Sequence, residues 1–363
     1  MPTPMPIRYE PALETVQPDE AQVHAGMIAT FAKIQATTRA DYGRAVRGVH
    51  AKGHGLLTGT LEVLPDLPPL AQGAFAAPGR HDVVLRLSTN PGDILDDSVS
   101  TPRGLAIKIL GVEGERLPDA EGTTQDFAMT NAPAFTAPDA KAFLGSLKLL
   151  AATTDTPQIV KKALSATLRG VESVLEAVGT GSPTVISLGG HPETHILGET
   201  LYSQVPVRWG EYVAKVAVAP VSSPLTALTG AALDVKGKPD GLRAAVTAFF
   251  AAHEGVWELR AQLPTNRDTM PVEDASVPWP EDESPYVAVA RVLVPRQEAW
   301  SAAKVERIDD GLAFSPWHGL ATHRPPDAVM RARRAVYPNS SDFRATHDGC
   351  PIREPTLLAG SLS

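Results

Sequence analysis

Apolar and polar residues follow a period of two in several short segments, a pattern that is typical of strands with one buried face. The clearest case is Tyr286–Pro295, which reads YVAVARVLVP and ends at a proline. Five further segments, bounded by turns with Gly or Pro, show the same pattern: Leu56–Leu64, Asp82–Thr89, Arg103–Leu110, Val205–Pro220 and Gly255–Leu263. The pattern therefore predicts two groups of three strands.

Segments before, between and after these two groups of strands have apolar residues at helical spacing. Helices are predicted over Asp19–Ala40, Asp139–Ala151, Thr156–Val178, Asp240–His253 and Pro326–Tyr337. Strands and helices do not alternate as in βαβ units, so the fold class is α+β, with an antiparallel sheet or barrel and segregated helices. Two domains divided near residue 150 are the alternative, but candidate site residues in both halves favour one unit.

Charge and composition exclude several classes of protein. The formal net charge is −8 and no long Lys/Arg run exists, which argues against a nucleic-acid partner. Cys350 is the single cysteine, so an intramolecular disulfide is excluded. The sequence has no apolar run of about 18 residues, so we expect no membrane span. Because Met1–Glu20 lacks the pattern of a secretory signal, a cytoplasmic protein is expected.

Two residues far apart in the chain could together act on a haem. Arg333 and Tyr337 are four positions apart, so they share a helix face, and a guanidinium beside a phenol favours the phenolate. A phenolate can bind haem iron, and a neutral imidazole such as that of His50 can carry protons near pH 7. Taken singly, each is more often a structural or surface residue. A tyrosine on one face of a haem and a histidine on the other would make a peroxide-cleaving site.

Other histidines are weaker candidates. His191 and His195 have the spacing of metal ligands on a helix, but Pro192 disfavours a helix there and no third ligand is apparent. His318 and His323 are predicted to be structural or to belong to the shell around Tyr337.

Four motifs in order resemble the haem catalases: VHAKG at 49–53, RLST at 86–89, PRGLAIK at 102–108, and R-x-x-x-Y-P at 333–338 with Arg344 after it. The resemblance covers about residues 30–347 and is closest to short catalase-related proteins without the C-terminal helical domain. It implies an antiparallel β-barrel of catalase type with helical insertions and C-terminal helices. The expected organisation is an N-terminal arm (1–18), a single haem-binding domain (19–347) and a C-terminal tail (348–363), with haem b as cofactor.

The resemblance also implies a role for each matching residue. Tyr337 becomes the iron ligand, His50 the distal acid–base residue, and Ser88 the group that orients it. The other haem-binding residues that it implies are Arg47, Arg86 and Arg344 for the propionates, Arg333 beside the phenolate, and Phe135 and Phe143 near the porphyrin. Counted from Pro133, Thr130 takes the place of the catalytic distal asparagine, but a shift of one residue would place Asn131 there, and we expect Asn131.

Departures from the catalase pattern lie where peroxide would enter. Asn90 stands for the valine that narrows the catalase channel, and Thr101 for an acidic residue. A wider, more polar channel implies a haem peroxidase that reduces hydrogen peroxide or organic peroxides with a small organic donor and keeps residual catalase activity. The alternatives are an enzyme that rearranges fatty-acid hydroperoxides and a haem-binding protein on a retained scaffold. No nucleic-acid or membrane partner is expected, and a homodimer or a monomer fits the lack of the extra domain.

Overall fold

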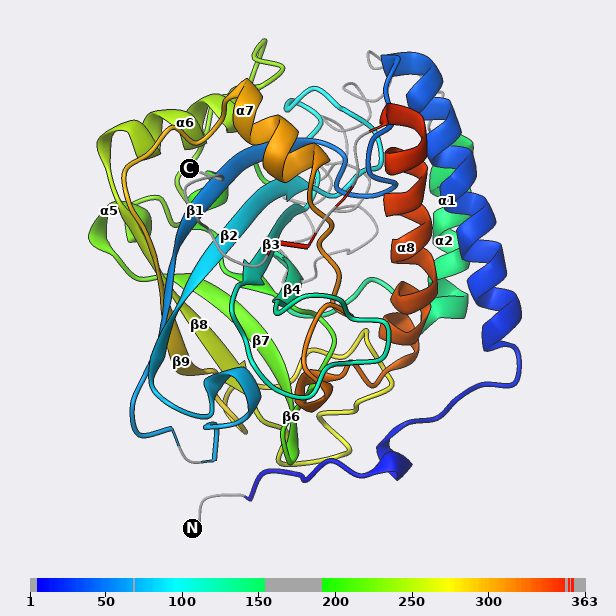
Figure 1. Cartoon of the computed structure of the whole chain (residues 1–363), viewed down its shortest axis with the longest axis vertical. Helices are drawn as coiled ribbons and strands as arrows, with labels where there is room; N and C mark the ends of the chain where they lie inside the picture. Colours follow the sequence, from blue (N-terminus) through cyan, green and yellow to red (C-terminus); the bar gives the residue numbers. More distant parts are fainter. Residues whose placement is uncertain (1–4, 68, 154–190, 350–351, 353, 356–363) are drawn as a thin grey trace, which may run out of the picture.

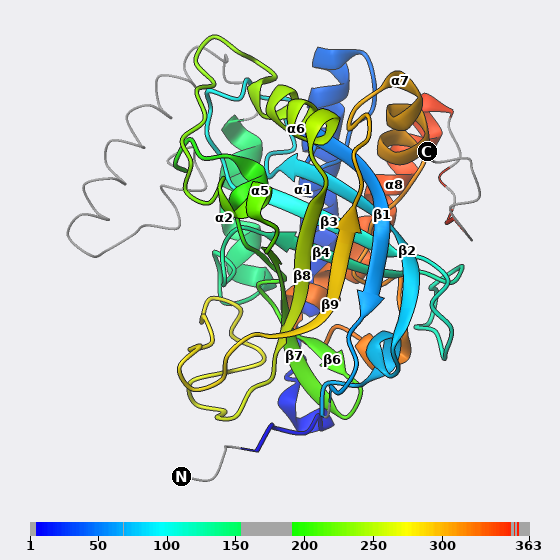
Figure 2. The same ribbon diagram turned by 90° about the vertical axis from the view of Figure 1, so that its left-hand side faces the viewer.

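The strands of the protein form one antiparallel sheet that closes into a barrel. In the computed structural model, which describes residues 5–67, 69–153, 191–349, 352 and 354–355, nine strands pair in the order β5-β4-β3-β2-β1-β9-β8-β7-β6, and a pairing of β5 with β7 closes the ring. Their bounds are β1 Gly53–Val63, β2 Gly79–Thr89, β3 Arg103–Ile109, β4 Gln125–Thr130, β5 Leu201–Tyr202, β6 Val207–Trp209, β7 Tyr212–Pro220, β8 Gly255–Gln262 and β9 Val287–Val294. Figure 2 shows β1, β9 and β8 side by side as part of the barrel wall.

Three long helices cover one flank of the barrel. These three are α1 Glu20–Tyr42, α2 Ala140–Thr153 and α8 Ala328–Asp348. The other α-helices of the described residues are α5 Ser223–Thr226, α6 Gly241–Ala252 and α7 Ala302–Lys304. Short 3-10 turns lie at Pro11–Leu13, Gly73–Phe75, Ile196–Gly198 and Ala321–His323, and a π turn lies at Val305–Asp310. Figure 1 shows α1, α2 and α8 together beside the barrel. Val23, Met27 and Phe31 of α1 pack against Ala332 and Val336 of α8. None of the helices in the described ranges is long and apolar enough to cross a bilayer.

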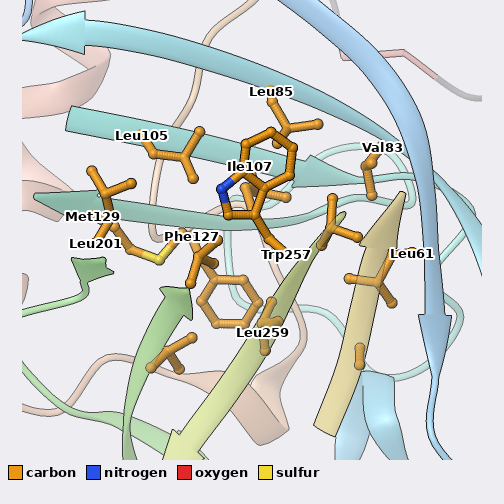
Figure 3. Packing of buried hydrophobic residues seen from close by; sticks show 14 of the residues in the cluster. Leu61, Val83, Leu85, Leu105, Ile107, Phe127, Met129, Leu201, Trp257 and Leu259 are labelled. Atoms are coloured by element: carbon orange, nitrogen blue, oxygen red, sulfur yellow. The ribbon is translucent and has the colours of Figure 1, made fainter. Parts of the chain in front are cut away.

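The period of two in the strands separates the barrel interior from its outer face. Leu85 of β2, Ile107 of β3 and Phe127 of β4 are almost fully buried and meet Trp257 inside the barrel (Figure 3). Because successive side chains point to opposite faces of a sheet, Arg86 and Lys108 face outward on the same strands. The interior is therefore an apolar core, and polar groups gather outside it.

The structure confirms the α+β class and most predicted elements. The six predicted strands are present, although Val205–Pro220 is divided into β6 and β7 by a turn at Gly210, whose φ is 61°. The sequence patterns missed β4 and β5. β1 pairs with β9, so strands from both sides of residue 150 belong to the same sheet. The predicted helix Thr156–Val178 lies outside the described residues.

The prediction that the last helix ends at Tyr337 is wrong. Helix α8 continues to Asp348 with Pro338 inside it. Pro338 has no N–H for the carbonyl one turn back, but Asn339 Nδ2 donates to the Ala335 carbonyl at 2.7 Å, and Ser341 Oγ donates to the Pro338 carbonyl at 2.9 Å. The proline therefore interrupts one hydrogen bond without ending the helix.

Candidate functional site

A cavity of about 390 Å³ lies between the outer face of the barrel and α8. Its walls come from the loop before β1, from β2, β3 and β4, and from the middle of α8. Nine candidate residues from the sequence line it: Arg47, His50, Arg86, Ser88, Thr130, His318, Arg333, Tyr337 and Arg344. The fold thus brings together residues that are almost 300 positions apart.

The barrel side of the cavity is formed by residues of β2, β3 and β4 that lie side by side in register. Arg86 pairs in register with Ala106, and Ala106 with Ala128, so small side chains stand next to the guanidinium. In the adjacent row, Gly104 pairs with Ser88. A Cβ at Gly104 would lie 2.5 Å from the His50 ring, so only glycine leaves room for the imidazole. Small residues on this wall allow a flat ligand to lie close to the strands.

His50 is held in place by its backbone and by one hydroxyl. Its φ is 53°, in the left-handed region that non-glycine residues rarely adopt, and its N–H donates to the Asn90 carbonyl at 2.8 Å. Nδ1 lies 3.1 Å from Ser88 Oγ. Burial, together with the charges of Arg86, Arg333 and Arg47, lowers the pKa of His50 to about 3. The imidazole is therefore neutral at physiological pH and can accept a proton.

This pKa predicts an unusual titration. Since the pKa is lowered, the ring stays neutral as pH falls from 8 through the ordinary range near 6.5, and it gains its proton only near pH 3. NMR of the imidazole nitrogens from pH 8 to pH 4 should show no protonation at His50, with the spectrum of a His50→Gln variant used to assign the signals. A midpoint near 6.5 would contradict this environment.

Three arginines gather at one end of the cavity around a single buried carboxylate. Asp309 Oδ1 lies 2.7 Å from Arg86 Nε and 2.5 Å from Arg47 Nη1, and Arg344 donates to the Asp309 carbonyl at 3.1 Å. Burial and mutual repulsion lower the pKa values of Arg47 and Arg344. The half-buried Asp310 adds a second carboxylate but also pairs with Arg44, so four guanidiniums face two carboxylates and the cluster favours further anionic groups. Sequence reasoning missed Asp309, which no motif marks.

On the opposite wall, α8 presents Tyr337 and Arg333. The Arg333 guanidinium lies 5.7 Å from the centre of the Phe135 ring, and Phe135 packs on Phe143 with ring centres 4.9 Å apart. These two phenylalanines are not among the described residues that line the cavity, and they support it through Arg333. Asp327 begins α8 by accepting hydrogen bonds from the N–H groups of Val329 and Met330. The helix start is therefore fixed two turns before Tyr337.

The structure places Thr130, and not Asn131, on the cavity wall. Asn131 Oδ1 accepts from the Arg103 N–H at 2.9 Å, and its Nδ2 contacts His191 and Glu199. Thr130 Oγ1 is buried and has no hydrogen-bond partner among the described residues. The free hydroxyl of Thr130 is thus available to a ligand in the cavity, whereas the Asn131 amide is engaged elsewhere, and the distal role expected for Asn131 stays a prediction.

The two spaced histidines do not form a metal site. His191 contacts Asn131, whereas His195 Nδ1 accepts the N–H of Leu197 at 3.2 Å. Over the part of the chain that the structure describes, no group of three or more His, Cys, Asp or Glu residues could hold a metal ion.

These residues fit a haem. The cavity combines a phenol that can bind iron, a neutral imidazole, small strand residues and an arginine cluster with excess positive charge. The buried Thr130 hydroxyl, which has no partner among the described residues, is consistent with a bound group in this cavity.

Comparisons with known proteins identify the fold of the chain. No protein-family model and no curated protein matches the sequence. Among solved structures, a fungal catalase has a TM-score of 0.59 at 18% identity, with 90% of this chain and 68% of that chain covered. Catalase A from Saccharomyces cerevisiae has a TM-score of 0.58 at 18% identity (85% and 63% covered), and a bacterial catalase has 0.54 at 16% (85% and 59%). The chain therefore has the catalase fold, in a form that spans about two thirds or less of the length of these catalases.

Proposed function

We propose that the protein is a haem-dependent oxidoreductase of catalase type that works as a peroxidase. Its oxidant would be hydrogen peroxide or an organic hydroperoxide, and a small organic donor would return the enzyme to its resting state. The observation that carries the proposal is one cavity lined both by an imidazole that burial keeps neutral and by a phenol on α8.

Each group of residues has a place in this function. Tyr337 would bind the iron of haem b, and Arg47, Arg86 and Arg344 would pair with the propionates. When bound, the haem supplies the redox chemistry that breaks the O–O bond of the peroxide.

The distal residues handle the proton. His50 is neutral, and its Nδ1 faces Ser88 Oγ, which leaves Nε2 to accept the peroxide proton and return it to the departing oxygen. Ser88 fixes the orientation of the ring, and the free Thr130 hydroxyl polarises the peroxide. Proton transfer at Nε2 is thus the step that the protein itself performs.

Replacing Tyr337 with phenylalanine should weaken haem binding by more than about 100-fold, because the iron loses its protein ligand. Mutating residues that only hydrogen-bond to a metal ligand already costs about 10–100-fold in affinity. The Soret band measured during haem titration would report the affinity. Tyr212→Phe, outside the cavity, is the matched control and should bind haem as the unchanged protein does. Equal affinities for the two variants would contradict Tyr337 as the ligand.

The activity itself has a direct test. Haem-loaded protein should oxidise a phenolic or dye donor only when peroxide is present. If no donor is oxidised although haem is bound, the peroxidase proposal is wrong.

A further inference from the structure

A second charged group, apart from the arginine cluster, lies behind the wall of the same cavity and borders the cavity through His318. Lys108 of β3 and Asp126 of β4 are paired in register and fully buried, with Nζ 2.9 and 2.8 Å from the two carboxylate oxygens. His318 Nδ1 lies 3.4 Å from the same carboxylate. Arg116 donates to the Thr124 carbonyl at 2.6 Å, and its Nε and Nη1 are buried without a partner among the described residues. The positively charged groups therefore outnumber the one carboxylate of Asp126.

A carboxylate from the C-terminal segment fills the group. Glu354 Oε2 accepts hydrogen bonds from Lys108 Nζ at 2.6 Å and from Thr124 Oγ1 at 2.9 Å, and Oε1 lies 3.0 Å from His318 Nδ1. The Glu354 side chain is 9% exposed. Glu354 and His318 both line the cavity, so this carboxylate stands where a molecule in the cavity could reach.

We propose that Lys108, Thr124 and His318 form a carboxylate-binding subsite for an organic substrate, and that Glu354 is its internal occupant. A site that binds one carboxylate with an ammonium, a hydroxyl and an imidazole can bind another at no change of net charge. Glu354 lies six positions beyond Asp348, the last residue of α8, so it belongs neither to that helix nor to a strand of the barrel. The inference rests on the proposed function for the role of the ligand as substrate.

The charge of His318 limits the pH range of this subsite. Burial opposes the charge, but the attraction of the Asp126 and Glu354 carboxylates beside Nδ1 outweighs it and raises the pKa of His318 to about 9. The imidazole is therefore cationic below that pH and becomes neutral as pH rises through it. Lys108 and Arg116 face the same carboxylates and add to the attraction, so binding should weaken near pH 9 without vanishing.

Benzoate is a suitable probe, and calorimetry on the full chain measures its binding without relying on activity. Glu354→Gln should bind benzoate at least about tenfold more tightly than the unchanged protein, because a tethered carboxylate competes at roughly millimolar effective concentration. Benzamide, a neutral analogue of the same shape, should not bind. Glu113→Gln removes an exposed charge three positions before Arg116 in the sequence and should behave as the unchanged protein does.

A double variant tests whether His318 contributes to benzoate binding. His318→Gln combined with Glu354→Gln should lose the gain in benzoate affinity, while Lys108 and Asp126 stay paired and the fold is kept. Equal binding of benzoate and benzamide, or equal benzoate affinity with and without Glu354, would overturn the subsite.

A carboxylate at this subsite could belong to an organic substrate or to a haem propionate, and haem loading distinguishes the two. Benzoate binding to both haem-free and haem-loaded Glu354→Gln protein supports a substrate subsite. Binding only to the haem-free protein means that a haem propionate takes this position and overturns the substrate assignment. A protein that binds benzoate but never takes up haem would contradict the proposed function and leave the subsite in place.

Discussion

Replacing His50 with alanine is expected to lower peroxide-dependent turnover by roughly 10²–10⁴-fold, the range that general acid–base groups contribute. The imidazole is neutral in this cavity, and Ser88 faces its Nδ1 at 3.1 Å, so alanine removes both the base and its fixed orientation. The rate of dye oxidation at saturating peroxide, normalised to haem content, is the measurement.

The matched control is His253→Ala, since His253 is exposed at the end of α6, outside the cavity. It should keep full turnover. Ser88→Ala should fall between the two because the base remains but loses its hydrogen-bond partner. A His50→Ala variant as fast as the control would show that the proton is handled elsewhere.

Replacing Asp309 with asparagine should cost about 3–5 kcal/mol of unfolding free energy in the haem-free protein, as expected when one partner of a buried ion pair is removed. Arg47 and Arg86 would then remain buried without their shared counter-ion. With haem bound, the propionates supply negative charge, so the loss should be smaller. Urea unfolding with and without haem measures both values.

Asp310→Asn offers a comparison at the next position. Asp310 is half-buried and pairs with the exposed Arg44, so we expect a loss of at most about 1 kcal/mol. If haem leaves the difference between the two variants unchanged, the arginine cluster does not hold propionates.

Most strands could be predicted because their two faces differ. In β2, the alternation of Leu85 and Leu87 with Arg86 and Ser88 is visible in the sequence. In β4, by contrast, Asp126 and Thr130 face the site and are enclosed by other segments, and a polar face that is itself buried has no simple sequence signature. β5 has two residues, too few for a period.

The site was predictable only where local motifs mark it. His50, Ser88 and Tyr337 stand in recognisable short segments, and the fold brings them to one cavity. Asp309 and Glu354 act through partners 262 and 246 positions away, and no local pattern encodes such a pairing. The contacts of Asn131 were not predictable for a similar reason, because its amide is engaged by Arg103, His191 and Glu199, which lie in other segments.

The shared strands of the barrel couple the cavity to the folding of the protein. Because side chains alternate along β2, β3 and β4, inserting or deleting one residue in a strand would exchange its two faces. Arg86 and Lys108 would then enter the apolar interior, and Leu85 and Ile107 would line the cavity. Such a chain would lose its core together with its site. Length changes in these strands should therefore yield insoluble protein, whereas point substitutions on the outer face can alter the chemistry and leave the barrel intact.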